Sequence, residues 1–186
     1  HKPIGPSPAI PSPSAFSSQP SYSTVAKQIF KRLKDSNIKI KIYQQCHNSQ
    51  NDQLFQFYKK AQIDFEVFNF TSNIINYYSK SNLVITRSGA SVLVELINLK
   101  IPFISIPLPT SADNHQYKNA EFYQKKGYGK FLEEKDIKNK LYDLIVSTFS
   151  DKLMLNSILL NQRQHSDKDI FKNLKNHIEK ILNEKN

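Results

Sequence analysis

The segment from residue 82 to residue 119 combines two short apolar runs with a glycine turn and a helical pattern between them. Residues 82–86 (NLVIT) are apolar and β-branched, as expected of a strand that is buried on both faces of a parallel sheet. After Gly89, apolar residues recur with the spacing of a helix over residues 90–99. Residues 101–108 (IPFISIPL) form a second buried run. This order of strand, helix and strand predicts a parallel sheet with helices on its faces.

The glycine turn has the chemistry of an anion-binding site. The first backbone N–H groups of a helix have no partner within the helix, and the helix dipole places partial positive charge at the same end. Gly89 carries no side chain, so a phosphate group can approach the backbone closely there. The polar residues 113–119 are expected at the same edge of the sheet, where open α/β sheets bind ligands. The pattern favours a ligand with a diphosphate group, although a plain helix cap would use the same residues.

Helical and strand patterns alternate through the rest of the chain. Strands are predicted at 38–43 (IKIKIY) and 64–70 (DFEVFNF), and helices at 25–33, 52–61, 74–79, 118–126, 133–149 and 167–182. Ser72 and Asn73 are expected to cap the third of these helices, and Gly127 and Gly129 to end the fourth. The predicted fold class is α/β, a Rossmann-like parallel sheet flanked by helices.

Residues 1–21 differ in composition from the rest of the chain. Six of the nine prolines lie in the first twenty residues, where they alternate with serine. Such a composition is typical of a linker or a disordered segment, and not of a strand or a helix. We therefore predict one folded domain, residues 22–186, behind a segment that is disordered or of foreign origin.

Length and cysteine content narrow the class of protein further. A chain of 186 residues is long enough to bury one sizeable core. The single cysteine, Cys46, excludes a disulfide framework and a cysteine-based metal cluster, so a reducing, cytoplasmic setting is expected. No apolar run is as long as a transmembrane span, and no signal sequence opens the chain. These features predict a soluble domain that is at most peripheral to a membrane.

The formal net charge of +10 permits three interpretations. Lysines are spread along the whole chain, which favours an ordinary solvated surface over a binding patch. Attraction to an anionic membrane is the second interpretation, and nucleic-acid binding is the third and least favoured. We therefore predict no nucleic-acid partner and a peripheral contact with anionic membrane.

The sequence TRSGAS, followed by VLVELI and then by a P-x-P turn and DNHQYKNA, resembles the C-terminal, donor-binding half of the MurG family of glycosyltransferases. The resemblance covers residues 35–182. It implies the C-terminal half of a GT-B fold. It also implies an inverting transfer of N-acetylglucosamine from UDP-N-acetylglucosamine to the lipid-linked muramyl-pentapeptide precursor of peptidoglycan, on the cytoplasmic face of the bacterial inner membrane.

The resemblance assigns the donor site to ten residues. Glu95 would accept hydrogen bonds from the two ribose hydroxyls of the uridine, and residues 88–91 would hold the diphosphate. Gln116 and Asn119, on one face of a helix, would bind the C3 and C4 hydroxyls of the sugar. His115 would form a hydrogen bond near the sugar or the phosphate. The full set is Phe70, Thr71, Ser88, Gly89, Ala90, Ser91, Glu95, His115, Gln116 and Asn119.

Several of these residues have structural alternatives. The backbone of Phe70 and Thr71 would contact the uracil edge, but Phe70 can equally belong to the core. Glu95 is expected on an apolar helix surface, where a carboxylate needs a bonding partner, and a solvent-facing glutamate is the alternative. His115 is interpreted as a hydrogen-bonding group and not as a general base, and a purely structural role is the alternative. Two roles are possible for Arg87: it could balance the charge of a phosphate, or it could form a surface salt bridge.

The chain departs from the family pattern at two points. Family members begin this half with a strand and a phosphate turn rich in glycine and serine, for which this chain has no equivalent among its four glycines. Val92 stands where family members often have a threonine, so a hydroxyl contact is missing there. Both departures predict a weakened donor pocket.

The catalytic parts of the family's fold are expected outside this chain. No pattern of histidine, cysteine or carboxylate has metal-ligand spacing, so we expect no catalytic metal and no cofactor. Backbone N–H groups and the helix dipole would stabilise the departing UDP. The general base and the site for the lipid-linked acceptor belong to the family's N-terminal half, so we assign no catalytic residue here. The isolated chain is expected to bind the donor weakly and to catalyse little or nothing.

Three alternative functions remain open. The chain could be the catalytic subunit of a split lipid-linked N-acetylglucosamine transferase, whose membrane partner holds the acceptor. It could belong to another two-domain glycosyltransferase or to a UDP-N-acetylglucosamine epimerase. It could also be a nonenzymatic basic module whose helix at 167–182 lies on anionic lipid, although packing of that helix on its own fold is the simpler expectation.

Overall fold

The computed structural model describes residues 20–165, with side chains from residue 28 onward. The strands are β1 (Lys41–Gln45), β2 (Asp64–Phe68), β3 (Val84–Thr86), β4 (Phe103–Ser105) and β5 (Lys130–Phe131). The α-helices are α1 (Pro20–Asp35), α2 (Asn51–Lys60), α3 (Ile75–Tyr78), α4 (Ala90–Asn98), α5 (His115–Lys125), α6 (Ile137–Ser150) and α7 (Lys152–Gln164). Short 3₁₀ helices lie in three connections, η2 (Asn48–Gln50), η3 (Ala112–Asn114) and η4 (Glu134–Asp136).

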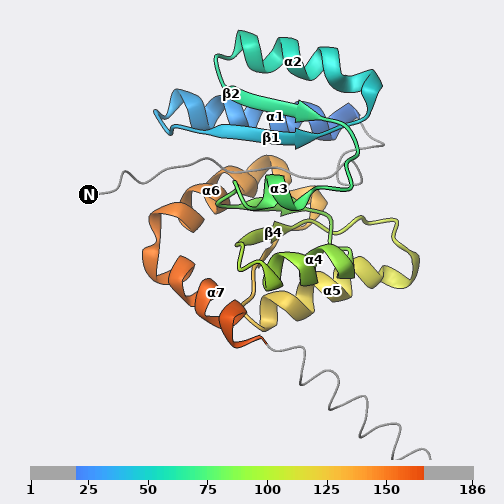
Figure 1. Ribbon diagram of the computed structural model, residues 1–186, viewed down its shortest axis with the longest axis vertical. Coiled ribbons are helices and arrows are strands. Elements are labelled where there is room, and N and C mark those ends of the chain that lie inside the picture. Colours follow the sequence, from blue (N-terminus) through green and yellow to red (C-terminus); the bar gives the residue numbers. More distant parts are fainter. Residues whose placement is uncertain (1–19, 166–186) are drawn as a thin grey trace, which may run out of the picture.

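The strands form two parallel sheets (Figure 1). β1 pairs with β2, with Lys41 opposite Asp64. In the second sheet β4 lies between β3 and β5, and Ile104 is opposite Ile85 on one side and Lys130 on the other. Among the strands described, β1 pairs only with β2, and β3 pairs only with β4. No described strand therefore joins the two sheets. Parallel neighbours need crossover connections, which is why helices separate the strands along the chain.

One hydrophobic core includes residues of both sheets. Ile42 of β1, Ile85 of β3 and Ile104 of β4 belong to it, together with buried residues of α1 and α6. A second core contains Val84 of β3 and the buried residues of α4. Side chains alternate along a strand, so Val84 and Ile85 point into different cores. Figure 1 shows α4 and α5 on one side of the three-stranded sheet and α6 on the side toward β1 and β2.

The structure confirms the predicted α/β class and most of the predicted elements. α2, β2 and α4 begin within one residue of the predicted positions. The strand predicted at 38–43 is shifted, because β1 starts at Lys41. Asn37 has a positive φ of 56°, and the backbone N–H of Ile38 donates to the carbonyl oxygen of Leu33 at 3.2 Å. The chain is therefore still completing the turn after α1 where the alternating pattern predicted a strand.

The predicted cap of α3 is wrong. The N-cap residue of α3 is Ile74, and no side chain caps the helix. Ser72 and Asn73 therefore do not have the predicted role. Instead, the hydroxyl oxygen of Thr71 accepts a hydrogen bond from the backbone N–H of Asn73 at 3.1 Å. The polar residues before α3 stabilise the preceding turn and not the helix.

β5 and α7 were not predicted. β5 is only two residues long, which is too short to give an alternating pattern. α7 did have a sequence signal, because Asp151 accepts a hydrogen bond from the backbone N–H of Met154 as an N-cap. The helix predicted at 133–149 begins at residue 137 as α6, and Gly127 follows α5 with a φ of 69°, as expected of a helix end. The helix predicted at 167–182 lies outside the described residues.

Leu83 tests whether one core supports both sheets. Its side chain is fully buried in the shared core, so Leu83→Ala is expected to lower the free energy of unfolding by about 2–5 kcal/mol. Leu153 on α7 is 83% exposed, and the same change there should alter the free energy by less than about 0.5 kcal/mol. Urea unfolding monitored by circular dichroism measures both values. Equal effects at the two positions would contradict the shared core.

Candidate functional site

The entrance of α4 is open. Gly89 is the N-cap of α4, with a φ of −66° and a ψ of 134°, a conformation that any residue can adopt. A Cβ atom at this position would meet no atom within 4 Å, and the next residue, Ala90, is exposed. Neither the backbone nor the packing requires glycine here. The open space lies where an anion would approach the first N–H groups of α4.

α4 has one buried and one exposed face. Leu93, Leu96 and Ile97 are buried, whereas Ser91 and Glu95 are exposed. Ser91 and Glu95 are four residues apart, which makes them neighbours on the same helix face. The expectation that Glu95 lies on an apolar surface is wrong, because the helix turns this residue to solvent. Its carboxylate is therefore accessible to a ligand without the cost of burial.

The last residue of α3, Tyr78, is close enough to Glu95 to respond to its charge. Burial, and after it the negative charge of Glu95, raises the pKa of Tyr78 to about 12. Both causes disfavour the charged form, since a buried tyrosinate is poorly solvated and a nearby carboxylate repels a second negative charge. α3, which follows the end of β2, therefore borders the Glu95 side of α4.

A hydrogen bond joins the glycine turn to the start of α5. Nδ2 of Asn119 donates to the backbone carbonyl oxygen of Ser88 at 3.0 Å. Ser88 is fully buried and Asn119 is half-buried. The bond uses the donor group of the Asn119 amide, so its Oδ1 is the atom suited to accept a hydrogen bond from a ligand hydroxyl. The structure thus brings two of the predicted clusters together.

The first residues of α5 are also connected to the loop after β4. Oε1 of Gln116 accepts a hydrogen bond from the backbone N–H of Leu108 at 2.9 Å, so its amide N–H groups are the donors suited to a ligand. The exposed His115 donates from Nδ1 to the carbonyl oxygen of Ala112 at 2.7 Å, which fixes the orientation of its ring. Gln116 and Asn119 both turn toward the ends of β3 and β4.

The loop before α5 makes a tight left-handed turn. Asp113 has a φ of 48° and Asn114 a φ of 54°. Asp and Asn tolerate this conformation better than other residues with a side chain. These two residues therefore form the turn, which directs α5 back toward the strand ends.

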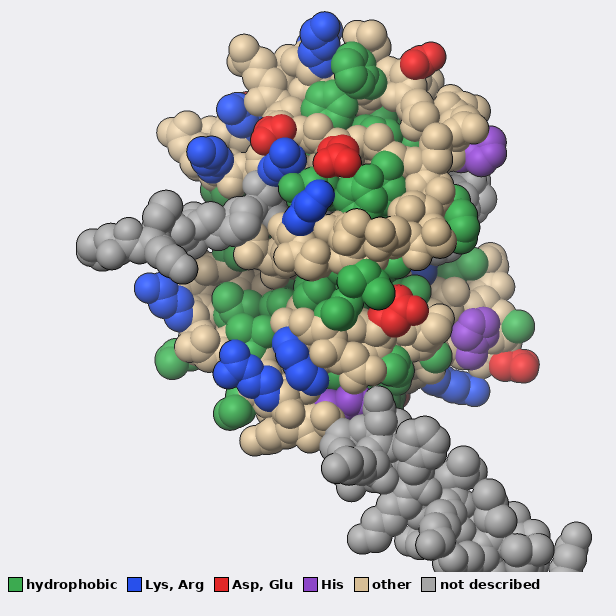
Figure 2. All heavy atoms as spheres, in the orientation of Figure 1, with side chains coloured by type: hydrophobic (Ala, Val, Ile, Leu, Met, Phe, Trp, Pro, Cys, Tyr) green, Lys and Arg blue, Asp and Glu red, His purple; other side chains and the backbone are tan. Residues whose placement is uncertain are grey.

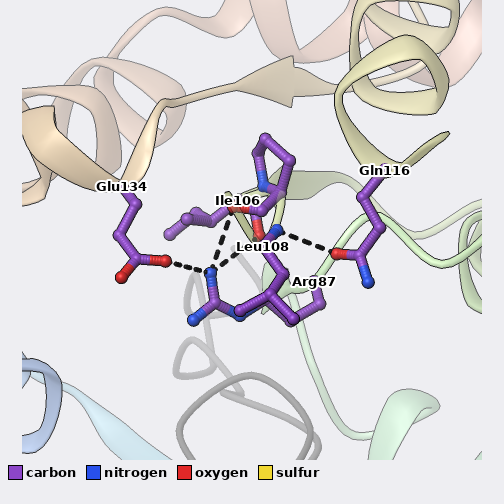
Figure 3. Close-up of polar contacts among 6 residues, drawn as sticks. Arg87, Ile106, Leu108, Gln116 and Glu134 are labelled. Carbon is purple, nitrogen blue, oxygen red and sulfur yellow. Dashed lines mark hydrogen bonds and ion pairs between the residues drawn. The ribbon is translucent and has the colours of Figure 1, made fainter. Parts of the chain in front are cut away.

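Arg87 lies beside Glu134 and the loop after β4 (Figure 3). Nη1 of Arg87 contacts Oε2 of Glu134 at 2.7 Å. The same atom donates to the carbonyl oxygens of Ile106 at 3.4 Å and Pro107 at 3.2 Å. The Arg87 side chain is 8% exposed and that of Glu134 is 18% exposed, so the interpretation as a surface salt bridge is wrong. Arg87, Ile106, Pro107 and Glu134 are called the Arg87 network below.

Phe70 and Thr71 lie in the connection between β2 and α3. Phe70 is 84% exposed, so the interpretation as a core residue is wrong. Thr71 is half-buried. Both residues follow a strand of the two-stranded sheet, whereas Gly89 and Asn119 belong to the three-stranded sheet and its helices. The structure therefore brings the glycine turn and α5 into direct contact and keeps the predicted base contact at a separate strand end.

Two neighbours of this site were not identified from the sequence. Glu134 follows β5, a strand that had no sequence pattern, so nothing connected it with Arg87. Tyr78 carried no signal beyond its place in a short amphipathic helix. Each becomes recognisable only when distant elements pack together.

On the face of the molecule shown in Figure 2, basic side chains lie over several elements and do not gather into one patch. Within residues 20–165, no helix is long and apolar enough to cross a membrane. In the same part of the chain, no group of three or more His, Cys, Asp or Glu side chains is arranged to hold a metal ion.

Comparison with known proteins identifies the family. The family model of the glycosyltransferase family 28 C-terminal domain matches residues 17–178. The chain belongs to this family. The UDP-N-acetylglucosamine–N-acetylmuramyl-(pentapeptide) pyrophosphoryl-undecaprenol N-acetylglucosamine transferase of Pelagibacter ubique is 35% identical over 149 residues, which are 80% of this chain and 42% of the relative. The protein of the same name from Rickettsia typhi is 38% identical over 135 residues, which are 70% of this chain and 35% of the relative.

The fold of this family 28 C-terminal domain is similar to that of a solved relative. The crystal structure of Acinetobacter baumannii MurG matches with a TM-score of 0.70 at 22% identity, over 88% of this chain and 46% of that chain. The chain thus spans less than half the length of these relatives. The predicted resemblance and the predicted GT-B fold are confirmed. The family match includes residues 17–21, and α1 begins at Pro20, where proline suits the first turn of a helix.

Tyr78 reports on the position of Glu95. Glu95→Gln should lower the pKa of Tyr78 from about 12, but not to the ordinary value of 10.0, because burial is the larger cause. The raised pKa also means that Tyr78 contributes to the stability of the fold. This contribution is fully present below pH 10 and is lost as the pH rises toward about 12, because the unfolded chain releases the Tyr78 proton at a lower pH than the folded chain does. NMR titration of ring-labelled tyrosine measures the shift, with Glu121→Gln on α5 as the control. An unchanged pKa in Glu95→Gln would show that the carboxylate lies elsewhere.

Proposed function

We propose that this chain binds UDP-N-acetylglucosamine and is the donor-binding half of an inverting N-acetylglucosamine transferase. The acceptor would be the lipid-linked muramyl-pentapeptide precursor of peptidoglycan. Two relatives named for this transfer, at 35% and 38% identity, support the proposal. The chain spans 42% and 35% of their lengths, so it supplies one part of the activity.

The observation that carries the proposal is the hydrogen bond between Asn119 and the carbonyl oxygen of Ser88. It holds a side chain suited to sugar hydroxyls against a helix entrance suited to phosphate. A nucleotide sugar is a ligand that presents both groups a few ångströms apart. A bare nucleotide would not need the amides of α5, and a free sugar would not need the N–H groups of α4.

Each part of the donor has a partner of matching chemistry. The diphosphate would lie at Gly89, where the open space and the helix dipole favour an anion. The ribose hydroxyls would donate to the exposed carboxylate of Glu95. Gln116 and Asn119 would bind the sugar hydroxyls, and the backbone at Thr71 would meet the uracil. Stabilisation of the departing UDP by backbone N–H groups that are already in place is the contribution of this half to the reaction.

The acceptor and the general base would come from a further domain. We assign no catalytic residue to this chain, because the resemblance places the general base in the family's N-terminal half. The proposed location is the cytoplasmic face of the bacterial inner membrane, with peripheral contact to anionic lipid favoured by the net charge of +10. The isolated chain should bind the donor weakly and transfer sugar slowly or not at all.

Glu95 should determine the affinity for the ribose. Loss of a charged hydrogen-bond acceptor in Glu95→Gln is expected to weaken UDP-N-acetylglucosamine binding roughly 10- to 100-fold. Isothermal titration calorimetry with the donor measures this. Glu121→Gln makes the same charge change at an exposed ion pair on α5 and should leave the affinity unchanged. Equal affinities of the two variants would refute the assignment of Glu95.

The variant Gly89→Ala distinguishes a requirement of ligand binding from a requirement of folding. Gly89→Ala should change the free energy of unfolding by less than about 1 kcal/mol, because its conformation suits alanine and the space is open. Donor affinity should nevertheless fall roughly tenfold, because the methyl group occupies the path of the phosphate. Gly127→Ala is the opposite control, since a φ of 69° and the Asn161 side chain make alanine unfavourable there. Normal donor binding by Gly89→Ala would contradict the proposed phosphate position.

A further inference from the structure

Arg87 is a buried charge that none of the proposed ligand contacts uses. Burying a guanidinium costs free energy unless it is paired and hydrogen-bonded. Glu134 and the carbonyl oxygens of Ile106 and Pro107 provide this compensation. Apolar residues often fill such a position with equal or better stability, so a buried ion pair is weak evidence of a purely stabilising role. The geometry that the pair imposes is the feature to explain.

The Arg87 network joins the ends of three neighbouring strands. Arg87 follows β3, Ile106 and Pro107 follow β4, and Glu134 follows β5. Figure 3 shows the guanidinium between the Glu134 carboxylate and the backbone of the loop after β4. Nη1 makes all three contacts, and its two N–H bonds lie in the rigid plane of the guanidinium, which restricts the directions in which the partners can lie. One side chain therefore sets the relative positions of the strand ends at the edge where open α/β sheets bind ligands.

The network continues directly to a proposed sugar contact. Leu108 is the next residue after Pro107, and its backbone N–H donates to Oε1 of Gln116 at 2.9 Å (Figure 3). Any displacement of the backbone at Pro107 would therefore weaken or redirect the bond that orients the Gln116 amide. Glu95, on the exposed face of α4, has no part in this chain of contacts.

We propose that Arg87 is a positioning residue, which holds the loop after β4 so that the Gln116 amide faces the sugar of the donor. The inference rests on the proposed function and adds to it the residue that sets sugar recognition. Arg87 acts through Leu108 and Gln116, and its paired charge is directed to Glu134. This role replaces the interpretation of Arg87 as a phosphate counter-charge.

A positioning role of Arg87 predicts that its substitution weakens the binding of UDP-N-acetylglucosamine more than the binding of UDP. Arg87→Lys keeps the positive charge but lacks the planar fork, so the affinity for UDP-N-acetylglucosamine should fall roughly tenfold while the affinity for UDP changes less than about twofold. Calorimetric titration with the two ligands measures the ratio. Loss of folded protein would lower both affinities alike, so the ratio distinguishes positioning from general stability.

A second measurement needs no ligand. The backbone N–H of Leu108 is protected by its bond to Gln116, so its hydrogen exchange in Arg87→Lys should be roughly tenfold faster than in the parent chain. Exchange of N–H groups inside α6 should not change, which separates a local release of the loop from global opening. NMR-detected exchange of the whole chain resolves both.

A substitution of Glu134, the ion-pair partner of Arg87, tests the same positioning role. Arg87 adjoins Ser88, so a change at Arg87 can disturb the glycine turn directly, whereas Glu134 is 47 residues away. Glu134→Gln should reduce the preference for UDP-N-acetylglucosamine over UDP in the same direction and by a smaller factor. Glu133→Gln is the matched control, because it removes the same charge one residue away, at the exposed pair with Lys135. It should change neither affinity.

The outcomes separate the two proposals. If the parent chain binds the donor and both Arg87→Lys and Glu134→Gln keep the parent's ligand preference and Leu108 exchange, the positioning role is refuted and the proposed function stands. Equal losses for UDP and UDP-N-acetylglucosamine also refute it. If the parent chain binds neither ligand, the proposed function fails and this inference fails with it.

Discussion

The burial of β3 on both faces is the constraint on which the site depends. Ile85 points into the core shared by both sheets, and Val84 points into the core that contains α4. Protein interiors are close-packed, so a strand held from two sides cannot shift without opening one of the two cores. The residues at its end, Arg87 to Gly89, therefore have a fixed position. The entrance of α4 takes its place and direction from them.

A rigid strand end does not make a site unless its polar groups have partners. Thr86, Arg87 and Ser88 are all buried, and buried polar groups are costly without hydrogen bonds. Glu134 and two carbonyl oxygens contact Nη1 of Arg87, and Nδ2 of Asn119 donates to the carbonyl oxygen of Ser88. These are the same contacts that bring the loop after β4 and the start of α5 to the glycine turn. Stability and site geometry thus have a common physical cause.

The elements around the site could be predicted because their signals are local. The apolar runs of β3 and β4 and the helical spacing of α4 arise from burial within each element, and the glycine turn lies between them in sequence. The environments of Glu95 and Phe70 could not be predicted in the same way. Whether a side chain on these elements is covered depends on what packs beside it, and both proved exposed. The residues of the donor site stay predictions until a ligand tests them.

The Arg87–Glu134 pair shows most clearly what could not be predicted from the sequence. Its members are 47 residues apart, and β5, the strand that brings Glu134 to the sheet edge, is two residues long. No periodicity can be read from two residues. The contact follows from the pairing of β5 with β4 and from the turn into η4, which are tertiary features. Sequence reasoning could state that a buried arginine needs a partner but not which one.

The two sheets place the predicted ligand contacts at different strand ends. From β1 the chain moves outward to β2, and from β3 it moves through β4 to β5 in the other sheet. Figure 1 shows β1 on the side of β2 that is nearer to the three-stranded sheet. Open α/β folds bind ligands outside the carboxyl ends of their strands. Gly89 lies at the end of β3, whereas Phe70 follows β2, a strand of the other sheet. A nucleotide sugar along this edge would place its diphosphate at α4, its sugar toward α5 and its base toward β2. The fold itself is similar in a relative at 22% identity.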